Sequence, residues 1–138
     1  MIGVIDTEGD CAEWAFPADP GAVRTARTVV RKQLADWGLG PLGDVTVLLV
    51  SELVTNSLRH ASGPIGVRLV RPMDPLDTLL VEVSDPLPDP PLERIAAVDD
   101  EGGRGLQLVS RSSRRWGTRP GRTGRTGKTV WFELALPG

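Results

Sequence analysis

The feature that most constrains the fold is an apolar run that carries polar side chains at a fixed interval. The run VTVLLVSELV covers residues 45–54 and is too short to span a bilayer. It continues into TNSLRHA, so that Glu52, Asn56 and His60 follow one another at intervals of four residues. On an α-helix this spacing places the side chains on one face, one per turn. The segment therefore predicts a helix over about 44–61 that packs into a core and presents a carboxylate, an amide and an imidazole.

Two interpretations of this polar stripe remain open. It is either a solvated face of a surface helix or a ligand site at the edge of the core. Glu52 and Asn56, one turn apart, can share a hard cation and its water, because an amide oxygen ligates Mg²⁺ and a carboxylate can orient or deprotonate a nucleophile. His60 can add a hydrogen-bond donor for a phosphate or a sugar hydroxyl, or it can be a simple surface residue.

The rest of the pattern predicts an α/β fold: a two-layer sandwich with a mixed, mostly antiparallel sheet and helices on one face. Alternating apolar and polar residues predict strands, and apolar residues three and four apart predict helices. Short turns between consecutive strands favour antiparallel pairing. The expected strands are 11–16, 63–72, 77–85, 114–120 and 128–137, and the other expected helices are about 20–37 and one opened by the glycines near 102–105.

The length and the longest irregular segment indicate how the chain is organised. The 138 residues suit one domain spanning 1–138, since a chain of this length can bury a real core. The segment PLPDPPLERIAAVDDEGG over 86–103 fits no regular element, apart from a short turn near 92–97. A loop this long inside a compact domain usually forms a lid or a binding loop. We place the lid at about 86–104.

Charge and cysteine content exclude several classes of protein. The net charge of −2 argues against a protein that coats nucleic acid. Eight basic residues and no acidic one lie between Arg104 and Lys128; they form a solvated surface or face phosphate or an acidic partner. Cys11 is the only cysteine, which excludes an internal disulfide and a structural zinc cluster. With no signal-peptide pattern at the start, we expect a cytoplasmic protein.

Two further motifs lie on either side of the long segment. Asp85 ends the predicted strand LLVEVSD, where it either begins a turn ahead of Pro86 or accepts a hydrogen bond from an exocyclic amine such as that of adenine. Gly102, Gly103 and Gly105 then open a helix. Free N–H groups at such a start can bind an anion, although a helix cap or a flexible loop would give the same pattern.

Together these motifs resemble the ATP-binding domain of the gyrase, chaperone, histidine-kinase and mismatch-repair superfamily (GHKL, the Bergerat fold). Within it they resemble the anti-sigma-factor serine/threonine kinases of bacterial sigma-factor switches. ELVTNSLRHA is similar to the N-box of these kinases, VEVSD to the approach to the first glycine box, GGRGLQLV to the second glycine box and GKTVWFEL to the last box. The resemblance extends over about residues 11–137.

The resemblance implies a role for each matching residue. It places Glu52 on the general base, Asn56 on the Mg²⁺ ligand and Asp85 on the carboxylate that recognises adenine. Thr129 falls on the residue that helps to hold Asp85 and the adenine. The residues that fall on the phosphate-binding helix start are Gly103, Arg104, Gly105 and Leu106.

The implied activity is ATP-dependent, Mg²⁺-assisted protein phosphorylation, which depends mainly on positioning and charge stabilisation. The expected partners are a sigma factor, held inactive by the kinase, and an anti-sigma-factor antagonist (an anti-anti-sigma, STAS-type protein) whose serine or threonine accepts the phosphoryl group. These kinases usually act as homodimers. We expect no direct binding to nucleic acid and none to a membrane.

One departure from the family pattern leaves two rival functions open. The first glycine box of the family reads Asp-x-Gly-x-Gly, whereas PLPDPP follows Asp85 here and Leu87 stands where a glycine would give adenine room. One rival is a nucleotide-binding regulator of the same fold with little or no kinase activity. The other is a protein-interaction domain that binds no nucleotide.

Overall fold

The chain forms one antiparallel sheet covered by helices. The computed structural model describes residues 3–8, 11–60, 63–71, 78–86, 101–120 and 127–136, and of residues 3–8, 60, 101–106 and 120 it describes the backbone alone. The elements are β1 (Gly3–Glu8), β2 (Cys11–Phe16), α1 (Gly21–Asp36), the short 3-10 helix η1 (Gly40–Leu42), α2 (Gly43–His60), β3 (Ile65–Val70), β4 (Thr78–Asp85), α4 (Glu101–Ser112), β5 (Arg115–Pro120) and β6 (Lys128–Ala135).

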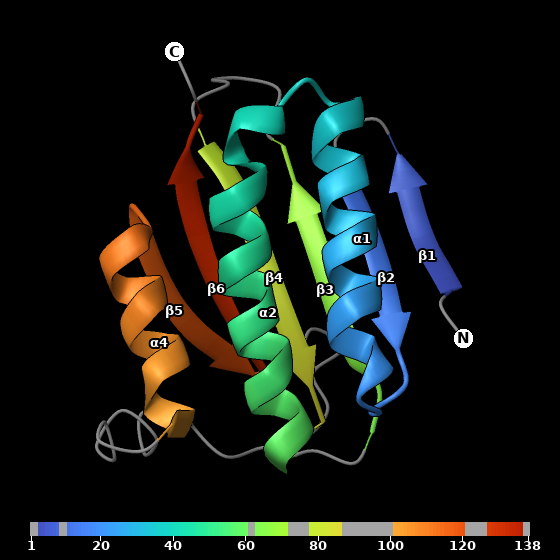
Figure 1. Cartoon of the computed structure of the whole chain (residues 1–138), viewed down its shortest axis with the longest axis vertical. Coiled ribbons are helices and arrows are strands. Elements are labelled where there is room, and N and C mark those ends of the chain that lie inside the picture. The colour runs from blue at the N-terminus through green and yellow to red at the C-terminus, as the bar shows by residue number, and fades with distance from the viewer. Residues whose placement is uncertain are drawn as a thin grey trace.

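The sheet has six strands in the order β1-β2-β3-β4-β6-β5. Every neighbouring pair among these strands is antiparallel, so the described sheet is not mixed. Helices α1, α2 and α4 lie on the same side of it (Figure 1). The predicted two-layer α/β sandwich with helices on one face is therefore confirmed.

The structure contains the predicted strands and helices with small shifts at their ends. It also contains strand β1, which the sequence pattern did not predict. Strand β1 pairs with β2, and its register shifts between Val4 and Asp6. A bulge of this kind breaks the strict alternation on which strand prediction depends. The predicted turn at 92–97, Leu87 and most of the predicted lid at 86–104 lie outside the described residues.

Helix α1 shows how local sequence sets an element. The Asp19 carboxylate accepts a hydrogen bond of 2.9 Å from the backbone N–H of Gly21, which satisfies one of the free donors at the helix start. The apolar residues at helical spacing then face the sheet. Those that are buried are Ala22, Ala26, Val30 and Leu34.

The core lies between the helices and the sheet. Alternate residues of β4, namely Leu79, Val81 and Val83, are buried with the apolar faces of α1 and α2. Side chains of the intervening residues point to the other face of the sheet. The end of β4 thus comes to lie beneath α2, which positions the site described below.

The helix-free face of the sheet carries a charged cluster on its central strands. Glu82 of β4 lies on this face, yet its side chain is 0% exposed. It pairs with Arg68, its cross-strand neighbour on β3, at 3.0 Å, and also with Arg119 of β5. The guanidinium groups offset the charge of a carboxylate that would otherwise be strongly destabilising when buried.

None of the helices within the described residues has the length and hydrophobicity needed to cross a membrane.

Adjacent leucines of α2 test this assignment of the core. Leu49 is completely buried and Leu48 is 46% exposed. We expect Leu49→Ala to lower the free energy of unfolding by about 2–5 kcal/mol, because it removes packing and leaves a cavity. The control Leu48→Ala should change it by about 0.5 kcal/mol or less. Urea denaturation followed by circular dichroism measures both, and equal effects would contradict the orientation of α2.

Candidate functional site

The polar stripe predicted on α2 runs from solvent into the protein. Helix α2 is continuous to His60, so Glu52 and Asn56 share one face, as predicted. Leu48, at the start of this stripe, is 46% exposed and Asn56 is only 7% exposed, while Glu52 between them is half-buried. The side chain of His60 lies outside the described residues. Burial therefore increases toward the C-terminal end of the helix, where α2 covers the end of β4.

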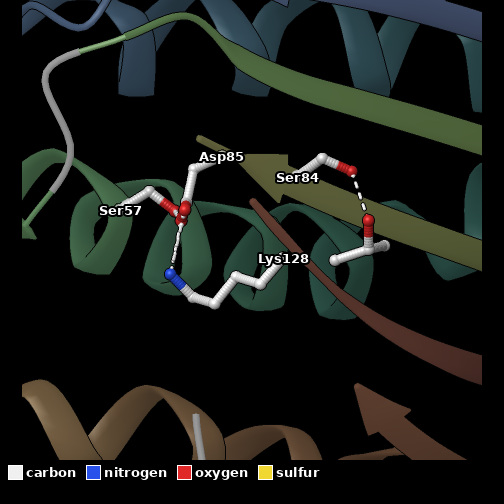
Figure 2. Close-up of polar contacts among 5 residues, drawn as sticks. Ser57, Ser84, Asp85 and Lys128 are labelled. Carbon is white, nitrogen blue, oxygen red and sulfur yellow. Dashed lines mark hydrogen bonds and ion pairs between the residues drawn. The ribbon is translucent and has the colours of Figure 1, made fainter. Parts of the chain in front are cut away.

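Asp85, the last residue of β4, has a deeply buried carboxylate. Its side chain is 2% exposed. The hydroxyl of Ser57 on α2 donates a hydrogen bond of 2.7 Å to Asp85 Oδ2. The ammonium of Lys128, the first residue of β6, lies 2.9 Å from Oδ1 and 2.8 Å from Oδ2 (Figure 2). Because a buried carboxylate needs partners, this cluster fixes β4, β6 and α2 together at one point.

A single glycine, Gly127, allows the start of β6 to approach the end of β4 at Asp85. In the pairing of β4 with β6, Asp85 lies directly opposite Lys128. Gly127, just before Lys128, has φ +134°, and a Cβ atom there would lie 2.7 Å from the Asp85 carbonyl oxygen. Only glycine fits such a position without strain. Residue 127 therefore sets the approach of β6 to the end of β4.

Asn56 is the second polar side chain of α2 at this place. It precedes Ser57, whose hydroxyl contacts Asp85, and it is itself buried. Its Oδ1 atom has no hydrogen-bond partner within the part of the chain that the structure describes. A buried amide oxygen without a partner is destabilising, and such a group in a native fold calls for an explanation such as a ligand or an ion.

The position of Thr129 in the structure does not match the role that the resemblance gave it, which was to help hold Asp85 and the adenine. Its side chain lies on the helix-free face of the sheet, where the hydroxyl is 2.8 Å from Ser84 Oγ. Among the described side chains, Lys128 of β6 and Ser57 of α2 donate hydrogen bonds to Asp85, and the sequence motifs indicated neither of them. The signal for Lys128 was its position at the start of a strand that pairs antiparallel with the end of β4.

The glycine-rich segment forms the first turns of α4. This helix begins at Glu101, so that Gly102, Gly103 and Gly105 lie within it, and it packs beside α2. The first four N–H groups of a helix have no partner inside it. The backbone N–H groups of residues 101–104 therefore have no acceptor within α4 itself. The side chains of Arg104 and Leu106 lie outside the described residues.

The buried amide oxygen of Asn56 is chemically suited to a divalent ion that is held against phosphate groups. The described part of the chain has no group of three or more His, Cys, Asp or Glu side chains that could hold a metal. An ion bound with a triphosphate does not require one, because phosphate oxygens and waters supply most of its ligands. The buried, unpartnered Oδ1 of Asn56 is suited to be the ligand that the protein adds.

The fit of a nucleobase at Asp85 depends on Lys128. A carboxylate can accept about four hydrogen bonds, and Ser57 and Lys128 already make three with Asp85. An exocyclic amine is a donor, as the ammonium is. Asp85 is therefore chemically suited to recognise an amine, but the Lys128 ammonium lies on both of its oxygens.

Comparison with known proteins agrees with this fold. The family model of the histidine kinase-like ATPase domain matches residues 16–134, a span that contains α2, Asp85 and Lys128. The chain belongs to the histidine kinase-like ATPase family, of the GHKL type, and membership implies ATP binding. No curated protein matches the chain at a significant level.

Gly127 offers a test of the geometry around Asp85. We expect Gly127→Ala to destabilise the fold by about 1–3 kcal/mol, because alanine is strained at this φ and its Cβ would meet the Asp85 carbonyl. Gly40→Ala is the control, since a Cβ at residue 40 meets nothing within 4 Å. It should change stability by about 0.5 kcal/mol or less. Thermal and urea unfolding measure both variants, and a harmless Gly127→Ala would contradict the close approach.

Proposed function

We propose that this protein is an ATP-binding anti-sigma factor with serine/threonine kinase activity. In this proposal it binds a sigma factor and phosphorylates a STAS-type antagonist. The observation that carries the nucleotide part is the meeting of α2 with the end of β4: Ser57 contacts the buried Asp85, and the adjacent Asn56 holds an unpartnered oxygen. The partners rest on the resemblance of the sequence boxes to those of the anti-sigma-factor kinases.

Each part of the site has a distinct task in binding. Asp85 accepts a hydrogen bond from the amine of the base, which discriminates adenine from bases without that donor. The N–H groups of residues 101–104 at the start of α4 donate to phosphate oxygens, and the helix dipole favours the negative charge. Asn56 ligates the Mg²⁺ ion through Oδ1.

Glu52 is the proposed general base. It lies one turn before Asn56 on the same face of α2 and is half-buried, so its carboxylate is on the same side of the helix as the proposed Mg²⁺ ligand. Bound ATP with Mg²⁺ would supply the phosphoryl group and neutralise its charge. Glu52 would orient the serine or threonine hydroxyl of the antagonist and accept its proton.

A second candidate is a regulator that binds nucleotide with little or no kinase activity. The ion pair of Asp85 with Lys128 favours it, because the base-recognising carboxylate is already satisfied within the protein. Pro86 follows Asp85 directly and stiffens the chain where the family has a flexible, glycine-rich segment. Transfer of phosphate to the antagonist distinguishes the two candidates.

Binding of ATP with and without Mg²⁺ tests the nucleotide site. We expect the chain to bind ATP and Asn56→Ala to weaken the Mg²⁺-dependent binding by about 10–100-fold, as loss of a metal-site group does. Binding without Mg²⁺ should change little. Titration calorimetry measures both, with Thr55→Ala on the adjacent position of α2 as control. Equal loss with and without metal would refute the ligand role of Asn56.

Glu52→Gln tests the catalytic assignment. We expect transfer of labelled phosphate from ATP to STAS-type acceptors to fall by about 10²–10⁴-fold, because the glutamine cannot accept the hydroxyl proton. ATP affinity should remain, since the substitution preserves size. Glu133→Gln on β6, on the opposite face of the sheet, is the matched control. Unchanged transfer in Glu52→Gln would remove Glu52 from the mechanism.

A further inference from the structure

Lys128 forms a buried ion pair with Asp85, the carboxylate that is proposed to recognise the base. Its side chain is 6% exposed and that of Asp85 is 2% exposed, so the pair is withdrawn from water. A lysine ammonium is strongly hydrated and is buried only with good compensation. The compensation here is contact with both oxygens of Asp85, at 2.9 and 2.8 Å.

The backbone holds Lys128 at this place. Asp85 and Lys128 are direct partners in the pairing of β4 with β6, and the close approach of Gly127 to the Asp85 carbonyl fixes the start of β6. A side chain anchored opposite its partner in a sheet reaches it with little loss of freedom. The ion pair therefore follows from the fold and is not a chance contact of a surface lysine.

The ammonium and an adenine amine make the same demand on Asp85. Both donate N–H groups, and both need a carboxylate oxygen at hydrogen-bond distance. Ser57 already occupies one position on Oδ2, and Lys128 contacts Oδ1 and Oδ2. A base that binds Asp85 through its amine must therefore compete with Lys128, which contacts both carboxylate oxygens.

We propose that Lys128 is an internal competitor of the nucleobase. Its ammonium takes the place of the adenine amine on Asp85, and nucleotide binds to the conformation in which this ion pair is open. The inference rests on the proposed nucleotide site. Its consequence is a lowered apparent affinity, because the intrinsic affinity is scaled by the fraction of molecules that are open. A base without the amine offers Asp85 nothing in exchange for Lys128, so selectivity for adenine comes from the contact that Asp85 makes in the open conformation.

The test compares MgATP binding by wild type, Lys128→Thr and Lys128→Gln in titration calorimetry. Threonine suits a strand and carries no ammonium group that could compete for Asp85. Lys128→Thr should therefore bind MgATP about tenfold more tightly than wild type. Lys128→Gln keeps one weaker donor and should fall between them. Lys32→Thr removes the same charge from an exposed site on α1, and its affinity should equal that of wild type.

Thermal unfolding with and without MgATP keeps the test valid if removal of the cation destabilises the fold. Loss of one partner of a buried ion pair leaves the other uncompensated, so Lys128→Thr should melt earlier without nucleotide and gain more from MgATP than wild type does. Lys128→Gln, which retains a donor for Asp85, supplies the same comparison if Lys128→Thr does not fold.

Two results would overturn the proposal while leaving the nucleotide site intact. One is an MgATP affinity of folded Lys128→Thr and Lys128→Gln that is equal to or weaker than that of a wild type that binds MgATP. The other is tighter binding of inosine triphosphate than of ATP by wild type, lost in Lys128→Thr, because Lys128 would then donate to a base carbonyl. Absence of MgATP binding in wild type and in both variants would instead refute the proposed nucleotide site itself.

Discussion

The buried cluster of Asp85, Lys128 and Ser57 is the interaction on which the arrangement of the molecule depends. Two opposite charges lie at less than a tenth exposure, and neither could remain there without the other. Their contact ties the end of β4 to the start of β6, and Ser57 adds α2 to the same point. The requirement extends to Gly127, since any side chain there would press on the Asp85 backbone. One electrostatic constraint thus organises two strands and a helix.

In the proposed function the same atoms serve both folding and recognition. A carboxylate that is free would bind a base readily but would destabilise the buried end of the sheet. A carboxylate that is paired stabilises the sheet but offers the base less. The unpartnered oxygen of Asn56 is the opposite case, because it leaves stability unrealised until a ligand arrives. The site therefore combines a carboxylate that is already paired with a buried amide oxygen that is not.

How much of this could be predicted differs between backbone and site. The periodicity of residues 45–54 gave α2 and the shared face of Glu52 and Asn56, because helical spacing is a local property. The alternation in LLVEVSD placed Asp85 at a strand end for the same reason. Lys128 and Ser57 were missed, since they contact Asp85 from 43 and 28 residues away in the sequence. The role of Lys128 also depends on which face of β6 its side chain occupies. A shift of one residue separates Lys128 from Thr129 and reverses the face, and sequence boxes alone do not fix that register.

The charged cluster on the helix-free face has a consequence for how this two-layer protein behaves among other molecules. Glu82 is sealed beneath Arg68 and Arg119, so the centre of the bare sheet presents guanidinium groups to water. Laying a second sheet over them would strip their hydration, which costs several kcal/mol per ion. The guanidinium groups on the helix-free side of the sandwich therefore oppose face-to-face stacking of two such sheets.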